Sequence, residues 1–253
     1  MSNRKERAVE VNARLAKLYP DARVELDFTN PFELLIATIL AAQSTDVRVN
    51  IVTKSLFRKY PNPQAFANAS QVEMETDVKQ TGFFRNKARA VIACSKAIVE
   101  KHGGEVPRTI EELVELPGVG RKTANVVLGN AMGIEAGVIV DTHVTRLSGR
   151  LGFTKHVDPV EIEQDLMKVV PRGEWTKFAN QLILHGRRIC VARKPLCDQC
   201  VLNDICPSAD VVRVDPASPA SSRGRSARSA TPPSKRPSRS RTSGSPRGRT
   251  PSR

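Results

Sequence analysis

The chain has 253 residues and a formal net charge of +14, from 40 Lys and Arg against 26 Asp and Glu. This length is enough for one or two hydrophobic cores, and the basic balance points to a polyanionic partner. Residues 1–22 are charged and amphipathic, with no apolar run long enough for export or a membrane span, so we expect neither a signal peptide nor membrane association. We therefore expect a cytoplasmic protein with reduced thiols.

Helix start signals recur along the chain. At Asn30-Pro31-Phe32-Glu33 a capping asparagine, a first-turn proline and a glutamate precede an apolar run. A capping side chain with a glutamate three residues later occurs again at Ser70 to Glu73, Thr109 to Glu112 and Asp158 to Glu161. These four starts predict helices over most of the chain.

The helix ends and the lack of strand patterns indicate the fold class. Glycines interrupt the apolar periodicity where helices should end, at Gly82, Gly103-Gly104, Gly152 and Gly173. No alternating stretch is long enough for a sheet, and the strand-like run Val138-Ile139-Val140 fits a buried connector equally well. The sequence predicts an all-α fold.

A glycine-rich turn follows the third helix start, in Leu116-Pro-Gly-Val-Gly-Arg-Lys-Thr-Ala124, and a second helix is expected from Thr123 to about Met132. Gly118 and Gly120 let backbone N–H groups approach a ligand, so a phosphate can bind there. A plain connection between two helices is the alternative. The cations Arg121 and Lys122 oppose the helix dipole in the first turn, and breaking a local preference in this way favours a functional site.

Lys122 and Asp141 are the candidate catalytic residues. A helix N-terminus and nearby apolar side chains both disfavour the ammonium form of Lys122, which makes it a candidate nucleophile; a second phosphate-binding cation is the alternative. Asp141, in Val140-Asp141-Thr142-His143, follows the buried run and precedes another helical stretch. It can cap that helix, and it can also stabilise positive charge on a reacting sugar or deprotonate the attacking amine.

Four cysteines end the part of the chain that we expect to fold, with the spacing C-x6-C-x2-C-x5-C, at Cys190, Cys197, Cys200 and Cys206. Four thiolates at this spacing can surround one compact metal centre. Structural zinc sites usually pair two short knuckles across a longer gap, so the uneven spacing favours iron–sulfur ligation, with zinc or disulfides as alternatives.

Residues 210–253 carry much of the charge. They hold 11 Lys and Arg against two Asp, a net charge of +9, which leaves +5 for residues 1–209. This Ser-, Pro-, Arg- and Gly-rich segment has almost nothing apolar to bury, so we predict that it is disordered. It is either a non-specific tether to nucleic acid or a solvated extension.

Residues 1–208 resemble the helix-hairpin-helix DNA glycosylases of the endonuclease III type. Three motifs carry the resemblance, namely Leu116–Ala124, Val140–His143 and the four cysteines. The resemblance implies two all-α domains with a DNA cleft between them. One is a six-helix domain at about residues 24–134, and the other joins residues 1–23 to residues 135–208 around a four-iron four-sulfur (4Fe-4S) cluster.

The resemblance also implies an activity in base excision repair, on double-stranded DNA with damaged or abasic sites. Lys122 would attack the anomeric carbon of an oxidised pyrimidine nucleotide, expel the base and form a Schiff base, whose β-elimination cleaves the strand 3′ to the lesion. Asp141 would act as a base and electrostatic stabiliser. The damaged nucleotide must first be flipped out of the duplex.

Two residues are expected to fill the space that the flipped nucleotide leaves. Gln43, in Ala41–Asp46, matches the family's inserting glutamine, and Phe83 matches a second wedge position where family members often have leucine. Without the resemblance, Gln43 would be a polar loop residue and Phe83 a core aromatic.

Further residues are expected to contact DNA phosphates. In the hairpin these are Gly118, Gly120 and Arg121; in the loop between the first two cysteines they are Arg193 and Lys194, for which exposed charge without a role is the alternative.

Other conspicuous side chains are assigned to structure. His143 and His185 are expected to be hydrogen-bonded, Trp175 to pack at a helix start, and Cys94 to be a buried free thiol. The sequence shows no second cluster, flavin motif or electron partner that would indicate a redox role. We therefore expect the iron–sulfur cluster to position its loop.

Two rival functions stay open. An adenine mismatch glycosylase shares the hairpin, the aspartate and the cysteine spacing, but that family typically lacks the lysine and carries a folded recognition domain after the cysteines. A non-catalytic helix-hairpin-helix module would bind DNA without forming a covalent adduct. Lys122 favours the bifunctional enzyme, which we expect to be a monomer.

Overall fold

The computed structural model describes residues 3–209, so the predicted disordered segment 210–253 lies outside the described residues. Over residues 3–209 the chain forms eleven α-helices and two short 3-10 helices, and no strand occurs in this range. The predicted all-α fold is confirmed. No helix in the same range has both the length and the apolar character needed to cross a bilayer.

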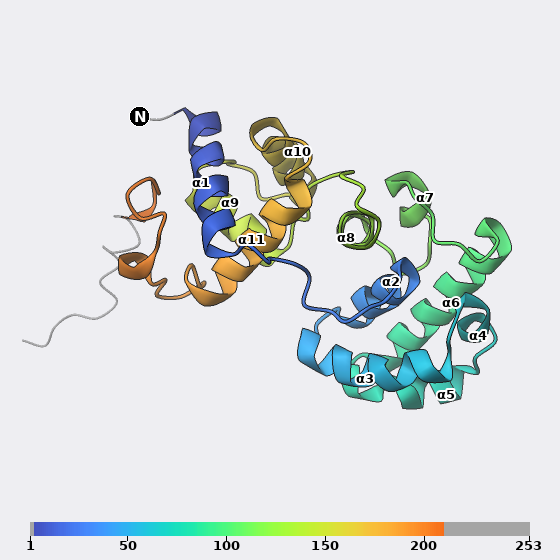
Figure 1. The fold of residues 1–253 in the computed structure, drawn as a ribbon. Coiled ribbons are helices and arrows are strands. Elements are labelled where there is room, and N and C mark those ends of the chain that lie inside the picture. Colours follow the sequence, from blue (N-terminus) through green and yellow to red (C-terminus); the bar gives the residue numbers. More distant parts are fainter. Residues whose placement is uncertain (1–2, 210–253) are drawn as a thin grey trace, which may run out of the picture. The chain divides into compact units, whose positions relative to one another are not determined.

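The helices form two groups (Figure 1). The larger group contains α2 (Pro31–Leu40), α3 (Asp46–Lys59), α4 (Pro63–Ala67), α5 (Gln71–Asp77), η1 (Lys79–Thr81), α6 (Phe84–His102), α7 (Ile110–Val114) and α8 (Arg121–Met132). The other contains α1 (Arg4–Leu18), α9 (Thr142–Arg150), α10 (Pro159–Val169), α11 (Trp175–Arg188) and η2 (Cys197–Gln199). Helix α8 packs against α2 and α7 of its own group and against α11 of the other, which places it at the junction.

The four predicted helix starts are confirmed. The side chains of Asn30, Ser70, Thr109 and Asp158 each accept a hydrogen bond from a backbone N–H of the first helical turn. One detail differs, because Glu33 accepts from the backbone N–H of Thr29 at 2.6 Å. The reciprocal bond therefore reaches one residue before the cap.

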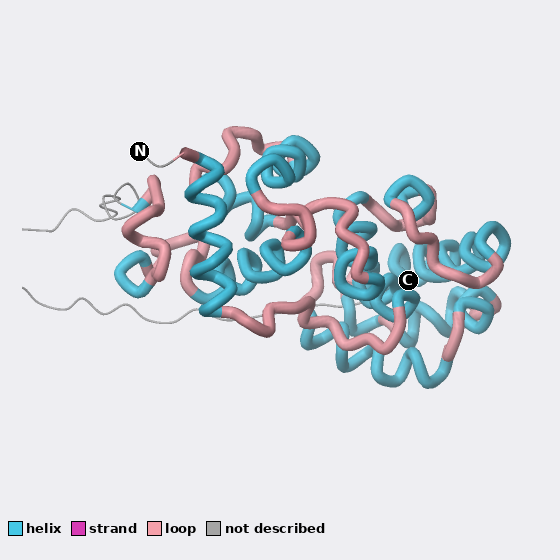
Figure 2. The backbone as a smooth tube through the Cα atoms, turned by 45° about the horizontal axis from the view of Figure 1, so that its top comes forward, coloured by secondary structure: helices cyan, strands magenta, loops and turns pink. Residues whose placement is uncertain are grey.

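Helix α2 is the centre of the larger group. Phe32 and every residue from Leu34 to Leu40 are buried, and α3, α6 and α8 pack around the helix. A short helix that is apolar on all sides is stable only inside a core. Figure 2 shows that helices joined by loops make up the described part of the chain.

The segment Val138–Val140 is a connector without strand pairing, which agrees with the second of the two interpretations left open above. All three side chains are buried, and the Val138 carbonyl accepts a hydrogen bond from Asn125 Nδ2 at 3.4 Å. The connector leads directly to Asp141.

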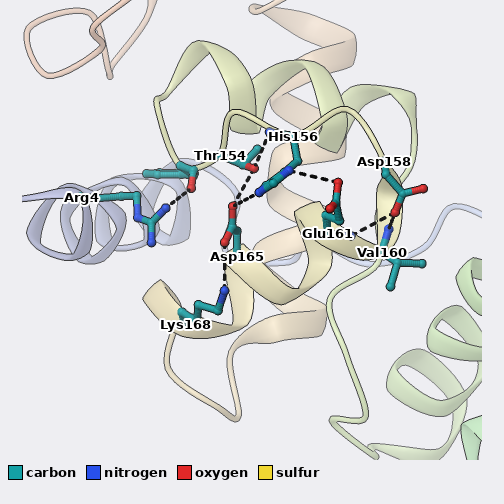
Figure 3. Close-up of polar contacts among 9 residues, drawn as sticks. Arg4, Thr154, His156, Asp158, Val160, Glu161, Asp165 and Lys168 are labelled. Carbon is teal, nitrogen blue, oxygen red and sulfur yellow. Dashed lines mark hydrogen bonds and ion pairs between the residues drawn. The ribbon is translucent and has the colours of Figure 1, made fainter.

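Polar contacts hold the loop between α9 and α10 in the second group (Figure 3). Thr154 Oγ1 donates to Asp165 Oδ2 at 2.8 Å, and Lys168 Nζ donates to the other oxygen of Asp165 at 3.1 Å. Arg4 of α1 donates to the Phe153 carbonyl at 3.2 Å. The N-terminal helix is thereby bound to the loop that follows α9, although about 150 residues separate them.

Candidate active site and iron–sulfur site

The glycine-rich turn joins α7 to α8. Gly118 has φ +80°, and a Cβ atom there would lie 2.9 Å from the Cβ of Ala90, so both backbone conformation and packing require glycine. Helix α8 begins at Arg121, two residues before the predicted start. Its N-cap, Gly120, supplies no side-chain acceptor, and its first turn holds no acidic residue. The first backbone N–H groups of α8 are therefore free to bind an anion.

Lys122 borders a cavity of about 70 Å³ between the two helix groups. The walls come from the segment Arg23–Leu26, from α2, α3, α8 and α11, and from the connector before α9. Part of the Lys122 side chain is exposed at the cavity mouth, while the surrounding protein removes much of its water. This desolvation lowers the pKa of Lys122, against the opposing effect of Asp141 and Asp46.

Asp141 lines the same cavity and caps α9. Its Oδ1 accepts from the Val144 backbone N–H at 2.8 Å. Capping and catalysis were the two interpretations left open for this residue. The structure confirms the cap and places the carboxylate in the cavity with Lys122, so the two roles are compatible.

The sequence analysis did not predict an ion-paired arginine at this cavity. Arg187, in the last turn of α11, donates to Asp46 Oδ2 at 2.8 Å and also pairs with Glu25. Its positive charge contributes to the lowered pKa of Lys122. No local motif marks these three residues, because they lie far apart in the sequence and their side chains meet only in the folded chain.

Arg121 takes part in an internal ion pair. Its Nε donates to Glu163 Oε2 at 2.6 Å and its Nη2 to Oε1 at 3.2 Å, while Asn125 Nδ2 donates to Oε1 at 3.0 Å. Glu163 is only 2% exposed and belongs to α10. The guanidinium thus joins α8 to the other helix group, and its predicted contact with DNA stays a prediction.

Three predicted DNA-contacting residues share an unusual backbone conformation. Gln43, Phe83 and Lys194 have φ of +54°, +47° and +53°, and within residues 3–209 they are the non-glycine residues with positive φ. All three are exposed. A non-glycine residue in this region costs roughly 1–3 kcal/mol and persists where the surrounding structure enforces it, often at functional sites. The family resemblance indicated Gln43 and Phe83, and the position between two cysteines indicated Lys194, so their shared backbone conformation is an independent observation.

The four cysteines line one cavity with otherwise mostly apolar walls. Two of the sulfur atoms accept hydrogen bonds suited to thiolate ligands: Arg150 Nη1 lies 3.2 Å from Cys190 Sγ, and the Leu202 backbone N lies 3.4 Å from Cys200 Sγ. In residues 3–209, no three Cys, His, Asp or Glu side chains converge on a point where one metal ion would be held. Four thiols around a shared apolar space fit a multi-iron cluster better than a single zinc ion.

The residues assigned to structure have that role. His185 is 1% exposed and lies between the Tyr19 hydroxyl and Cys200 Sγ, each at 3.3 Å. His143 Nδ1 lies 3.2 Å from Arg146 Nη2, and Trp175 Nε1 donates to a backbone carbonyl. Cys94 is fully buried, and burial raises the pKa of its thiol to about 12. These four predictions are confirmed.

Comparison with known families agrees with this geometry. Residues 36–172 match the HhH-GPD superfamily of base excision DNA repair proteins, and residues 190–206 match the iron-sulfur binding domain of endonuclease III. The fold and the site define a helix-hairpin-helix protein of base excision DNA repair.

The particular family follows from the relatives. The chain is 54% identical to endonuclease III of Synechocystis sp. over 209 residues, which cover 83% of this chain and 95% of the relative. It is 40% identical to endonuclease III of Escherichia coli over 210 residues, which cover 83% and 99%. The chain belongs to the endonuclease III family.

Solved structures give the same result. A trapped endonuclease III–DNA covalent intermediate matches with a TM-score of 0.78 and 44% identity, covering 83% of this chain and 99% of that one. A non-covalent endonuclease III–DNA complex also matches with a TM-score of 0.78 and 44% identity. A thermostable thymine-DNA glycosylase, at 22% identity and a TM-score of 0.75, shares the fold. The chain is a DNA-binding glycosylase and abasic-site lyase with a 4Fe-4S cluster.

Proposed function

We propose that Lys122 is the nucleophile of this glycosylase/lyase. The observation that carries the proposal is the position of its amine, which borders the same cavity as Asp141 and has a lowered pKa. A neutral amine can attack the anomeric carbon of the flipped nucleotide, and the base leaves as the carbon–nitrogen bond forms. Ring opening gives the Schiff base, and loss of the proton at C2′ then expels the 3′ phosphate.

Asp141 assists each attack in this proposal. Its carboxylate can take a proton from the Lys122 ammonium and can stabilise positive charge that develops on the sugar. The cap bond from Val144 uses Oδ1 at 2.8 Å, which leaves the other carboxylate oxygen for this role.

Contacts with DNA complete the proposed site. Gln43 and Phe83 fill the space left by the flipped nucleotide, and the backbone N–H groups of Gly118, Gly120 and the first turn of α8 bind a phosphate. Arg193 and Lys194 bind phosphates from the cysteine loop. The cluster, when bound, supplies rigidity to this loop, and Cys190, Cys197, Cys200 and Cys206 are the residues that would hold it.

We propose oxidised pyrimidines and abasic sites in duplex DNA as substrates. We also propose that the protein acts in the cytoplasm as a monomer, with residues 24–134 as one DNA-binding domain and residues 1–23 with 135–208 as the other. The two helix groups and the cavity between them support this division.

A direct test compares base release from duplexes that differ only in the lesion. Release of thymine glycol, followed by strand cleavage on its 3′ side, is the expected result. Excision of adenine from a mismatch, without cleavage, would favour the adenine glycosylase. Binding to both duplexes without base release would instead favour the non-catalytic module. Light scattering on the DNA-free protein tests the monomeric state.

A further inference from the structure

Lys87 is a buried lysine that the proposed chemistry does not use. It lies on α6, it is only 5% exposed, and its ammonium donates to the Thr81 carbonyl at 2.7 Å. Burial lowers the pKa of Lys87, and no carboxylate contributes to that shift. Burial of a cation without an anionic partner is energetically unfavourable. This cost indicates that the hydrogen bond from the Lys87 ammonium has a role in the protein.

The bonded carbonyl lies at the start of a strained turn. Thr81 ends η1, is 2% exposed, and its hydroxyl donates to the Val78 carbonyl at 2.8 Å. Gly82 and Phe83 follow with φ of +70° and +47°. Glycine adopts positive φ freely, but phenylalanine at positive φ costs roughly 1–3 kcal/mol and persists only where its surroundings enforce it.

Lys87 supplies that restraint from both sides of the turn. Its ammonium bonds to the carbonyl before Gly82, and its backbone N–H donates to the Phe83 carbonyl at 3.1 Å. Phe83 is the N-cap of α6 and has no side-chain cap bond of its own. One residue thus fixes both ends of the segment that projects the Phe83 ring, which is 65% exposed.

We infer that Lys87 is a positioning residue for base extrusion: by bonding to Thr81 it holds the Gly82–Phe83 turn so that the Phe83 ring is already oriented for insertion into DNA. The inference rests on the proposed role of Phe83. Because the turn and the Phe83 ring are already ordered, no conformational entropy is lost in ordering them when the duplex opens. Lys87 itself touches neither substrate nor the reacting atoms.

The test combines two substrates with a double-mutant cycle. Lys87→Met removes the donor and keeps an unbranched side chain that can stay buried, and Lys96→Met removes an exposed charge from the same helix as a matched control. The first measurement is single-turnover base excision from a duplex with one thymine glycol. The second is cleavage of a single-stranded oligonucleotide with a preformed abasic site, where no base pair has to open.

We expect Lys87→Met and Phe83→Ala each to slow duplex excision about tenfold, which corresponds to roughly 1.4 kcal/mol. The double variant should be no slower than Phe83→Ala, because both changes remove the same function. Single-strand cleavage by Lys87→Met should stay within about twofold of wild type, and Lys96→Met should match wild type on both substrates.

Other outcomes separate the two claims. Wild-type duplex excision by Lys87→Met, alongside a slow Phe83→Ala, would overturn the inference and leave the proposed wedge intact. A further loss in the double variant, or slow single-strand cleavage, would show that Lys87 acts through the fold and would also overturn it. Normal excision by Phe83→Ala would overturn both claims.

A second pair of variants keeps the test valid if Lys87→Met does not fold. Lys87→Gln retains a neutral donor, so a smaller loss on the duplex substrate is expected. Gly82→Ala strains the same turn without steric conflict, because a Cβ there meets nothing within 4 Å. It should slow duplex excision only while Phe83 is present; equal slowing in the Phe83→Ala background would contradict the inference.

Discussion

At the scale of residues, the proposed chemistry depends on the protonation state of Lys122. Only the neutral amine attacks, so activity rises as the pH rises through its pKa. Burial lowers that pKa, Asp141 and Asp46 raise it, and Arg187 lowers it. The arginine and aspartate that bond to each other therefore act on the lysine in opposite directions.

Substitution of Asp46 or Arg187 should shift the acid limb of the pH profile of the cleavage rate. Asp46→Asn removes a charge that raises the pKa of Lys122, so the limb shifts to lower pH. Arg187→Gln removes a charge that lowers it, so the limb shifts to higher pH. Single-turnover cleavage of a preformed abasic site across a pH series checks both signs. Glu100→Gln, which changes an exposed carboxylate on α6, should leave the profile unchanged; shifts of the same sign in the two test variants would contradict this account.

The two roles of Asp141 can be separated by a pair of substitutions. Asparagine caps helices about as well as aspartate, so Asp141→Asn should change the free energy of unfolding by only a few tenths of a kcal/mol, whereas Asp141→Ala should lower it by about 1 kcal/mol. Both should slow base excision by roughly 100-fold or more. Urea unfolding and single-turnover kinetics measure the two effects. Full activity in Asp141→Asn would contradict the catalytic role of Asp141 and leave helix capping as its function.

Sequence reasoning predicted the residues that lie in motifs and missed those that do not. Lys122 and Asp141 each belong to a short run with a recognisable pattern, and the structure places both at one cavity. Arg187 and Glu25 are separated by 162 positions and pair only through tertiary packing. Spacing along the chain cannot predict such a pair.

At the scale of elements, the α8–α10 junction depends on one buried carboxylate. Glu163 accepts from Arg121 and Asn125, and a Cβ on Gly137 would lie 1.9 Å from its Oε1. The connector before Asp141 therefore passes directly against this carboxylate. Helix start signals predicted where α8 and α10 begin to within two residues, but no signal in either helix predicted that they are joined by this ion pair.

Removal of the Glu163 carboxylate should weaken the junction. Glu163→Ala leaves Asn125 and Arg121 without their acceptor, and because Arg121 is partly exposed we expect a loss of about 1–3 kcal/mol in the free energy of unfolding. Glu161→Ala, two residues away in the same helix, removes an exposed carboxylate and should cost about 0.5 kcal/mol or less. Urea unfolding of the three proteins provides the comparison. Equal stabilities for the two variants would show that the buried pair adds nothing.

At the scale of the whole molecule, the cysteine loop is bound to both ends of the second helix group. Arg146 and Arg150 of α9 donate to the carbonyls of Cys190 and Val191, and Arg14 of α1 pairs with Asp204. Asp141 is the N-cap of α9, so the helix that follows the proposed catalytic carboxylate also supports the loop. These arginine contacts hold the loop, and the cluster, when bound, would add a second restraint.

Loss of the cluster should release the loop and weaken DNA binding. In Cys197→Ala we expect loss of the visible iron–sulfur absorption, faster proteolysis within residues 190–206 and weaker affinity for duplex DNA. If Arg193 and Lys194 each bind one phosphate, the slope of log affinity against log salt should fall in magnitude by about 2. Cys94→Ala, at a buried thiol outside the cluster, should keep the absorption and the slope. Unchanged binding after verified cluster loss would contradict the positioning role.

The claim that Lys122 forms the covalent bond to DNA is tested most directly by borohydride trapping. Wild-type protein and Lys122→Gln are each incubated with a duplex that contains one thymine glycol and are then reduced, and the products are separated by denaturing electrophoresis. A protein–DNA adduct with the wild type, and none with the variant, is the predicted result. An adduct that persists in Lys122→Gln, or its absence from a wild-type protein that still releases the base, would contradict the account.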